Sequence, residues 1–363
     1  EYVKVVEIRS DTTNQEAILW RTSSFVIDDE NQIFVADSNN NRIAVFDFTG
    51  TYQRSIGREG DGPGEFRYPS TIRYINGKLQ IPGRDQRVTI YNTDGTLDEV
   101  ISYQHARSGS YIASATIAPD GTYVIQKITE EGGDGYIGRS FGFCTRTPAG
   151  DTLAIIETPI LRLMERIDRR ATIIRFSPQP QAHYAPGRGI YISTGLPPEI
   201  DWYDLDGNLR RKIRLILDEE PVSSADRRRV TEYYNRKIAN ADSEVQGEFV
   251  ERVPAEFYEW QRDNARYASL KAHWATTRVD DLGFIWLELH ETTGSFTYET
   301  HVHEFLVLSP EGEFLGRTST PPVDFLSLGK GYLLASVSDR DTGEMIPTVY
   351  SIRPAVRGLR YPE

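Results

Sequence analysis

Cysteine is almost absent from this 363-residue chain, which contains only Cys144. A single cysteine excludes an intrachain disulfide and a cysteine-based metal cluster, and it leaves the cellular compartment open. Long apolar runs are also missing, because no segment approaches the roughly 18 apolar residues of a membrane-spanning helix. The first residues, Glu1 to Lys4, lack the apolar region of a signal peptide, as expected of a mature chain whose export signal has been removed.

Positive charge is in deficit. The sequence has 41 basic and 53 acidic residues, which gives a net charge of -12. A surplus of negative charge repels phosphate backbones, so nucleic acid is not an expected partner. The 39% of hydrophobic residues nevertheless supplies enough apolar surface for a substantial core.

An internal repeat of hairpins runs along the chain. Six segments place β-branched or aromatic residues on both sides of a polar turn. They are 25–37, 71–83, 115–127, 175–194, 277–289 and 324–337. Five of them precede a second hairpin whose tight turn needs a glycine at positive φ. These glycines are Gly50, Gly95, Gly150, Gly207 and Gly312.

Two hairpins per unit predict a four-stranded antiparallel blade. Six such blades predict an all-β fold, a six-bladed β-propeller that occupies residues 1–363 as one domain. A β-sandwich is the alternative. The sixth unit lacks a fourth strand, whereas the alternating segment Tyr2 to Ile8 has no hairpin partner. We therefore expect the N-terminal strand to complete blade six and close the ring.

The segment Val35 to Ile72 resembles an NHL repeat that continues into the next blade, and blade two carries a degenerate version of it in residues 81–95. The whole chain is similar in architecture to six-bladed propellers of bacterial envelopes and secretomes. The resemblance implies a periplasmic or extracellular location, with membrane anchoring as a lipoprotein before processing as an option. It also implies ligand binding at the mouth of the central channel.

Residues 218–268 interrupt the hairpin rhythm with many Glu, Arg, Tyr and Ala residues. Ser223 or Ser224 is placed as an N-cap, and Pro254 lies near the start of a second helix. The sequence predicts a helical insertion between blades four and five that partly covers the channel mouth or extends its rim. Four aromatic residues of this insert form a predicted recognition surface. They are Tyr233, Tyr234, Tyr258 and Trp260.

The loops expected at the channel mouth hold most of the candidate binding residues. These are Asp37, Asn39, Asn41, Arg42, Arg58, Asp61, Glu65, Arg84, Asp85 and Arg87. The loop 37–42 begins like a calcium loop, but Arg42 and Phe48 stand where a glycine and a bidentate glutamate are required. We expect instead that Asp37 and Asn41 bond the loop backbone and that Arg42 pairs with a neighbouring blade. The glycine-rich stretch 57–66 lacks the ending of a phosphate-binding loop and predicts an inter-blade connection.

Three histidines of blade five form the candidate metal site: His290, His301 and His303, with Glu288 and Glu291 close in sequence. Imidazoles beside a carboxylate suit zinc or another transition metal. The alternative is that all three histidines lie on a solvated rim.

Two functions follow from these observations. The leading hypothesis is a binding or scaffold propeller without a cofactor, because no complete catalytic signature is present. It would engage a protein, peptide or glycan of the cell envelope through the insert-covered face, as one component of a larger assembly. The alternative is an enzyme, a metal-dependent hydrolase or lyase similar to lactonases, with one divalent metal ion at the channel mouth.

Overall fold

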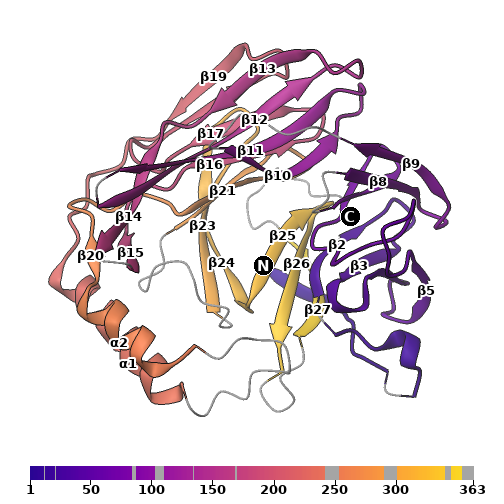
Figure 1. Cartoon of the computed structure of the whole chain (residues 1–363), viewed down its shortest axis with the longest axis horizontal. Helices are drawn as coiled ribbons and strands as arrows, with labels where there is room; N and C mark the ends of the chain where they lie inside the picture. The colour runs from indigo at the N-terminus through magenta and orange to yellow at the C-terminus, as the bar shows by residue number, and fades with distance from the viewer. Residues whose placement is uncertain are drawn as a thin grey trace.

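In the described residues the strands form six sheets, antiparallel apart from one short parallel pair, arranged as the blades of a propeller (Figure 1). This computed structural model describes residues 1–11, 13–20, 22–83, 87–102, 110–133, 135–167, 170–241, 253–289, 301–339 and 345–353. No helix in these ranges combines the length and the apolar character that a membrane-spanning helix requires.

The first three blades follow in chain order. Blade one contains β2 (Thr22–Ile27), β3 (Ile33–Asp37), β4 (Arg42–Phe46) and β5 (Tyr52–Ile56). Blade two contains β6 (Arg73–Ile75), β7 (Lys78–Pro82), β8 (Arg87–Asn92) and β9 (Leu97–Ser102). Blade three contains β10 (Ser110–Ile117), β11 (Tyr123–Gly133), β12 (Tyr136–Arg146) and β13 (Thr152–Glu157).

The remaining blades complete the ring. Blade four contains β16 (Gln181–Ala185), β17 (Gly189–Ser193), β18 (Glu199–Tyr203) and β19 (Leu209–Arg214). Blade five contains β21 (Thr276–Val279), β22 (Ile285–Glu288), β23 (His301–Leu308) and β24 (Phe314–Val323). Blade six contains β25 (Phe325–Gly329), β26 (Tyr332–Ser338), β27 (Met345–Ile352) and, as its outer strand, β1 (Tyr2–Glu7). The predicted closure by the N-terminal strand is confirmed.

The five predicted turn glycines all lie between the third and fourth strands of a blade. Their φ angles range from +84° to +94°, a region that is strained for residues with a Cβ atom. The prediction of the second hairpins is therefore confirmed at each of these turns. The hairpin expected over 175–194 is shorter than predicted, because it spans β16 and β17 only.

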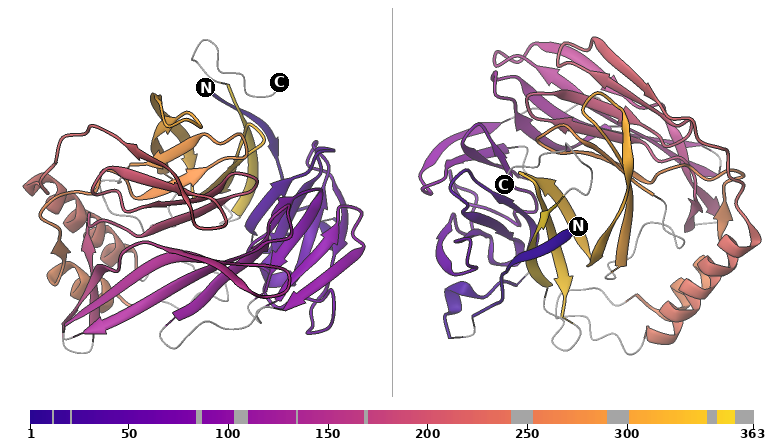
Figure 2. Two further views of the ribbon diagram at one scale, coloured as in Figure 1. Left: turned by 90° about the horizontal axis from the view of Figure 1, so that it is seen from above. Right: turned by 180° about the vertical axis from the view of Figure 1, so that it is seen from behind.

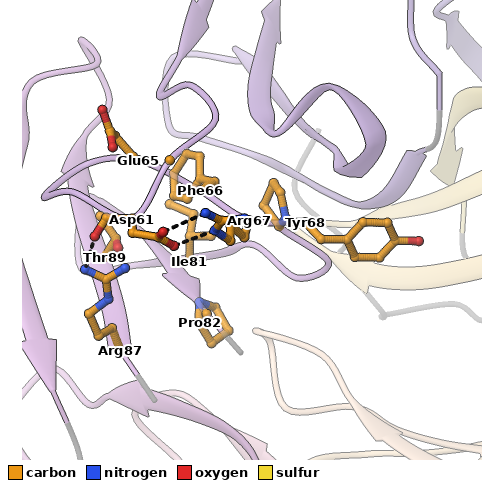
Figure 3. Close-up of a pocket in the computed structure, with 12 residues that line it drawn as sticks. Asp61, Glu65, Phe66, Arg67, Tyr68, Ile81, Pro82, Arg87 and Thr89 are labelled. Carbon is orange, nitrogen blue, oxygen red and sulfur yellow. Dashed lines mark hydrogen bonds and ion pairs between the residues drawn. The ribbon is translucent and has the colours of Figure 1, made fainter. Parts of the chain in front are cut away.

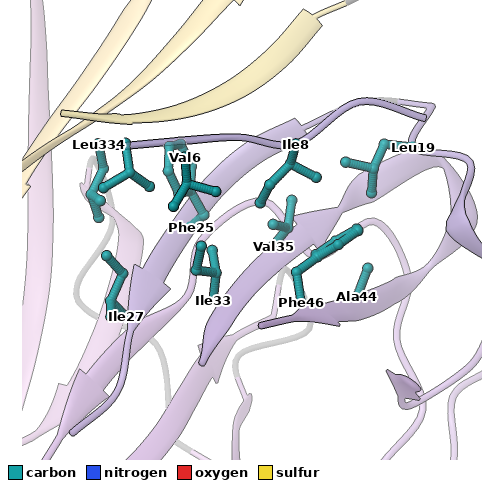
Figure 4. Packing of buried hydrophobic residues seen from close by; sticks show 11 residues of the cluster. Val6, Ile8, Leu19, Phe25, Ile27, Ile33, Val35, Ala44, Phe46 and Leu334 are labelled. Carbon is teal, nitrogen blue, oxygen red and sulfur yellow. The ribbon is translucent and has the colours of Figure 1, made fainter. Parts of the chain in front are cut away.

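Six clusters of buried apolar side chains fill the gaps between neighbouring blades. Figure 4 shows the cluster between blades six and one, where Val6 and Ile8 at the end of β1 pack beside Phe25, Ile33 and Val35 of blade one. Because each blade buries both faces against its neighbours, the core is a ring of interfaces rather than a single centre.

Blade three carries an extension that the sequence analysis did not predict. Its strands β11 and β12 are 11 residues each, and the outer side of β12 pairs first with β14 (Leu161–Ile167) and then with β13. The chain then forms β15 (Arg170–Arg175) against β14. Gly142 permits the close approach of β13, since a Cβ atom there would lie 2.3 Å from the Ile156 carbonyl oxygen.

The insert between blades four and five contains α1 (Ser224–Asn240), α2 (Ala255–Asp263) and the short strand β20 (Arg266–Tyr267), which pairs in parallel with β15. Ser223 caps α1, and its side chain and that of Asp226 form a reciprocal capping box. Figure 2 shows the two helices and blade one at opposite ends of the molecule. The insert thus extends the ring beside blade three.

His183 on the inner strand β16 provides a test of the packing between blades four and five. Its Nε2 atom lies 3.0 Å from the carbonyl oxygen of Val279, and burial lowers the pKa of the imidazole to about 4. The unfolded chain takes up this proton near pH 6.5, so the folded state loses stability as the pH falls from 6.5 towards 4. We expect a loss of about 1–3 kcal/mol in the free energy of unfolding.

Denaturant unfolding at pH 7 and at pH 4.5 measures this effect. The variant His183→Gln keeps a donor for Val279 but cannot titrate, so its stability should fall less over this range. An equal fall in both proteins would contradict the assignment of a neutral, buried imidazole.

Candidate functional site

The described inter-blade connections and the described loops between second and third strands lie on one side of the ring, which we call the loop face. Blade one supplies the loop 37–42, which contains the short helix η2 (Ser38–Asn40). The Asp37 carboxylate is fully buried. It accepts hydrogen bonds from the backbone N–H of Trp20 (3.1 Å), Asn40 Nδ2 (2.7 Å) and Arg42 Nε (3.1 Å).

The same loop holds the connection from blade one to blade two. Asn41 accepts a hydrogen bond from the backbone N–H of Tyr68 at 2.6 Å, and the Ser38 hydroxyl donates to the carbonyl oxygen of Pro69 at 2.6 Å. Asn41 and Tyr68 both adopt positive φ angles, +53° and +57°. The loop 37–42 thus fixes two segments of the loop face, one from each side of blade one.

These contacts refine the expectation for this loop. Asp37 and Asn41 do bond backbone groups, as predicted. Arg42 does not pair with a neighbouring blade: it binds Asp37 of its own blade and donates to the carbonyl oxygen of Ile18, which precedes β2. A buried carboxylate in this loop draws the guanidinium inward, because an unpaired buried charge is costly.

A cavity of about 420 Å³ opens beside this connection, at the loop-face end of blade two (Figure 3). Phe66, Ile81 and Pro82 form its apolar floor, and Asp61, Glu65, Arg67, Tyr68 and Arg87 are among its other lining residues. Phe66 and Ile81 belong to the buried cluster between blades one and two. The floor is therefore part of the core and is held rigidly.

The charged rim of this pocket is ordered by its own contacts. Asp61 accepts two hydrogen bonds from Arg67, at 2.5 Å from Nε and 2.6 Å from Nη2. The Arg87 Nη1 atom donates to the carbonyl oxygen of Asp61 at 3.0 Å. The hydrogen bond from Arg67 lowers the pKa of the Asp61 carboxyl. Glu65 accepts from the Gly62 N–H at 2.9 Å and from Arg58 Nε at 3.0 Å.

The structure thus brings three of the predicted mouth residues, Asp61, Glu65 and Arg87, to one pocket. Arg58 does not line the pocket but forms an ion pair with Glu65, which does. Asn39 is partly exposed on the loop of blade one. Arg84 and Asp85 lie outside the described residues. Sequence reasoning missed Arg67 and Tyr68, although both directly follow Phe66 in the segment that carries the NHL resemblance.

Two of the four predicted aromatic residues of the insert, Tyr233 and Tyr234, are buried, which corrects the expectation that they belong to an exposed surface. Tyr233 and Tyr234 are 7% and 4% exposed, and they pack with Phe176, Val230 and Tyr258. Arg175 of β15 donates to the Tyr234 hydroxyl. Trp260 is partly buried, with the Arg170 guanidinium 5.4 Å from its ring centre. These rings fasten the insert to blade three, because the unpredicted β15 gives them a surface to cover.

In blade five, His303 is buried and its Nδ1 atom lies 2.6 Å from Glu288 Oε1, so it does not lie on a solvated rim. Glu288 also contacts Arg278 Nη2 at 3.3 Å. Burial raises the pKa of Glu288, but the His303 hydrogen bond and the Arg278 charge outweigh it and hold the pKa below its ordinary value.

No group of three potential metal ligands occurs among the residues that the structure describes. His290 and the side chain of His301 fall outside them, so the metal site stays a prediction.

Fold and pocket together define a six-bladed β-propeller with a pocket on its loop face. A protein family described as "6-bladed beta-propeller" matches residues 12–104, which cover blades one and two. None of the curated proteins matches the chain.

Solved propeller structures resemble the whole chain. A member of the DUF4221 family from Bacteroides vulgatus has 11% sequence identity and a TM-score of 0.48, and the match covers 98% of this chain and 99% of that one. Virginiamycin B lyase from Staphylococcus aureus has 9% identity and a TM-score of 0.41, with 97% and 99% covered. A protein of unknown function from Bacteroides caccae has 12% identity and a TM-score of 0.37, with 86% and 85% covered. Likenesses this remote lend no support to a shared activity.

Asp37 gives a direct test of how the loop face is held. The variant Asp37→Asn removes the charge that Arg42 faces in a buried site, and we expect the free energy of unfolding to fall by about 3 kcal/mol. Denaturant unfolding measures the loss. Asp47→Asn is the matched control, because Asp47 caps an exposed turn of the same blade. The control should lose less than about 1 kcal/mol. Equal losses would show that the buried carboxylate has no special role.

Proposed function

We propose that this chain is a binding propeller that engages a short segment of a partner protein in the loop-face pocket of blades one and two. The observation that carries the proposal is the combination of an apolar floor and a charged rim within one cavity of about 420 Å³. Binding pockets of this size are typically apolar with a few placed polar groups.

The pocket is well suited to binding because its walls are fixed. One wall is held by two hydrogen bonds, from the Tyr68 N–H to Asn41 and from the Ser38 hydroxyl to the Pro69 carbonyl oxygen, and the core residues Phe66 and Ile81 hold the floor. A ligand therefore finds the site already formed, which reduces the entropy lost on association.

A peptide fits this pocket better than a glycan does. The floor is formed by Ile81, Pro82 and the buried Phe66, and such a surface suits an aliphatic or aromatic side chain more than a hydroxylated sugar ring. A location in the periplasm or outside the cell, inferred from the family resemblance, would give access to partners of the cell envelope and stays a prediction.

To test the proposal, peptides are first selected from a displayed library for binding to the purified protein. The NMR resonances of the isoleucine δ1-methyl groups then show where the selected peptides bind. Bound peptides should shift the methyl resonance of Ile81 and leave that of Ile238, on α1, unchanged. Shifts at Ile238 without shifts at Ile81 would move the binding site to the insert and contradict the proposal.

A further inference from the structure

Asp61 engages both arginines of the pocket rim, Arg67 through its carboxylate and Arg87 through its backbone carbonyl oxygen. Its carboxylate receives the paired Nε and Nη2 bonds of Arg67, the geometry in which a guanidinium recognises any carboxylate. Arg87 donates to the main chain of the same residue, which keeps a second guanidinium at this point. Figure 3 shows Asp61 between the two arginines.

The contact between Asp61 and Arg67 lies at the surface. The two side chains are 70% and 68% exposed, so each can turn into water without uncovering buried apolar surface. An ion pair in such a position contributes little net free energy, because water competes for both partners. The pair is therefore easily exchanged.

We propose that the pocket recognises a ligand carboxylate next to an apolar side chain, and that this carboxylate takes the place of Asp61 on Arg67, with Arg87 as a second cation. This inference rests on the proposed function and names the chemistry of the bound segment. A ligand gains over Asp61 because its own apolar group is removed from water inside the cavity lined by Phe66, Ile81 and Pro82, which does not happen with the short aspartate side chain.

The carboxylate of such a segment comes from one of two sources, a free C-terminus or an acidic side chain. Three peptides separate them: acetyl-Ala-Ala-Leu with a free carboxylate, the same peptide as its C-terminal amide, and acetyl-Leu-Glu-Ala-amide. Binding is followed by the shift of the Ile81 methyl resonance and quantified by titration at low ionic strength, where exposed charge contacts are least screened.

We expect one carboxylate peptide to bind the wild-type protein about tenfold more tightly than the amide peptide. The variant Asp61→Asn removes the internal competitor, so carboxylate binding should tighten by about two- to fivefold while amide binding stays constant. Arg67→Met should remove most of the difference between carboxylate and amide binding, because only Arg87 is left as a cation. Asp98→Asn, which removes an ion-paired aspartate elsewhere on blade two, is the control and should change neither.

The outcomes separate this inference from the proposed function. If all three peptides shift Ile81 with equal affinity, or if Asp61→Asn weakens carboxylate binding, carboxylate recognition is wrong and the pocket still binds peptides. If no peptide shifts Ile81 in any variant, both proposals fail. The two Asp→Asn substitutions do not change the size of the side chain, and Arg67 is exposed. We therefore expect all three variants to fold.

Discussion

Closure of the ring depends on the pairing of β1 with β27, which joins residues more than 340 positions apart. Tyr2 pairs with Ile352 and Glu7 with Thr348, and the backbone carbonyl of Arg353 accepts a hydrogen bond from the N-terminal amine of Glu1. Without β1, blade six would lack its outer strand, and the apolar cluster around Phe25 would lose Val6 and Ile8. A propeller has no other core, so every interface of the ring relies on this junction to keep its neighbours in place.

The loop 37–42 links this closure to the candidate binding face. On one side, Asp37 and Arg42 hold residues 18–20, through which the chain passes from β1 into blade one. On the other side, Asn41 and Ser38 hold the wall of the pocket. The polar residues that make this segment resemble an NHL repeat are thus engaged in positioning the chain, and the residues left to meet a ligand are those of the following connection.

The sequence was sufficient to predict those features of the fold that depend on the chemistry of a few neighbouring residues. The turn glycines, the alternation in Tyr2 to Ile8 and the N-cap at Ser223 each carry a signal within a few residues, and the structure confirms all three features. The strands β14 and β15 were missed because they pair with a part of β12 that extends beyond the blade, and nothing within 161–175 signals that extension.

The failure to predict β15 also led to a wrong expectation at the insert, and a comparable omission occurred at the pocket. Tyr233 and Tyr234 of α1 were expected to be exposed because the partner that buries them was unknown. Arg67 was overlooked for a similar reason. Its role comes from a fold-back of the connection that places Asp61 against it, and sequence spacing alone does not show which way these side chains turn.

A crystal structure of the protein with the tighter-binding of the two carboxylate peptides tests the central claim most directly. We expect the leucine side chain over Phe66 and Ile81, with the carboxylate of the peptide on Arg67 and the Asp61 side chain turned towards water. A peptide seated elsewhere, or one that leaves the Asp61–Arg67 pair intact, would contradict the claim.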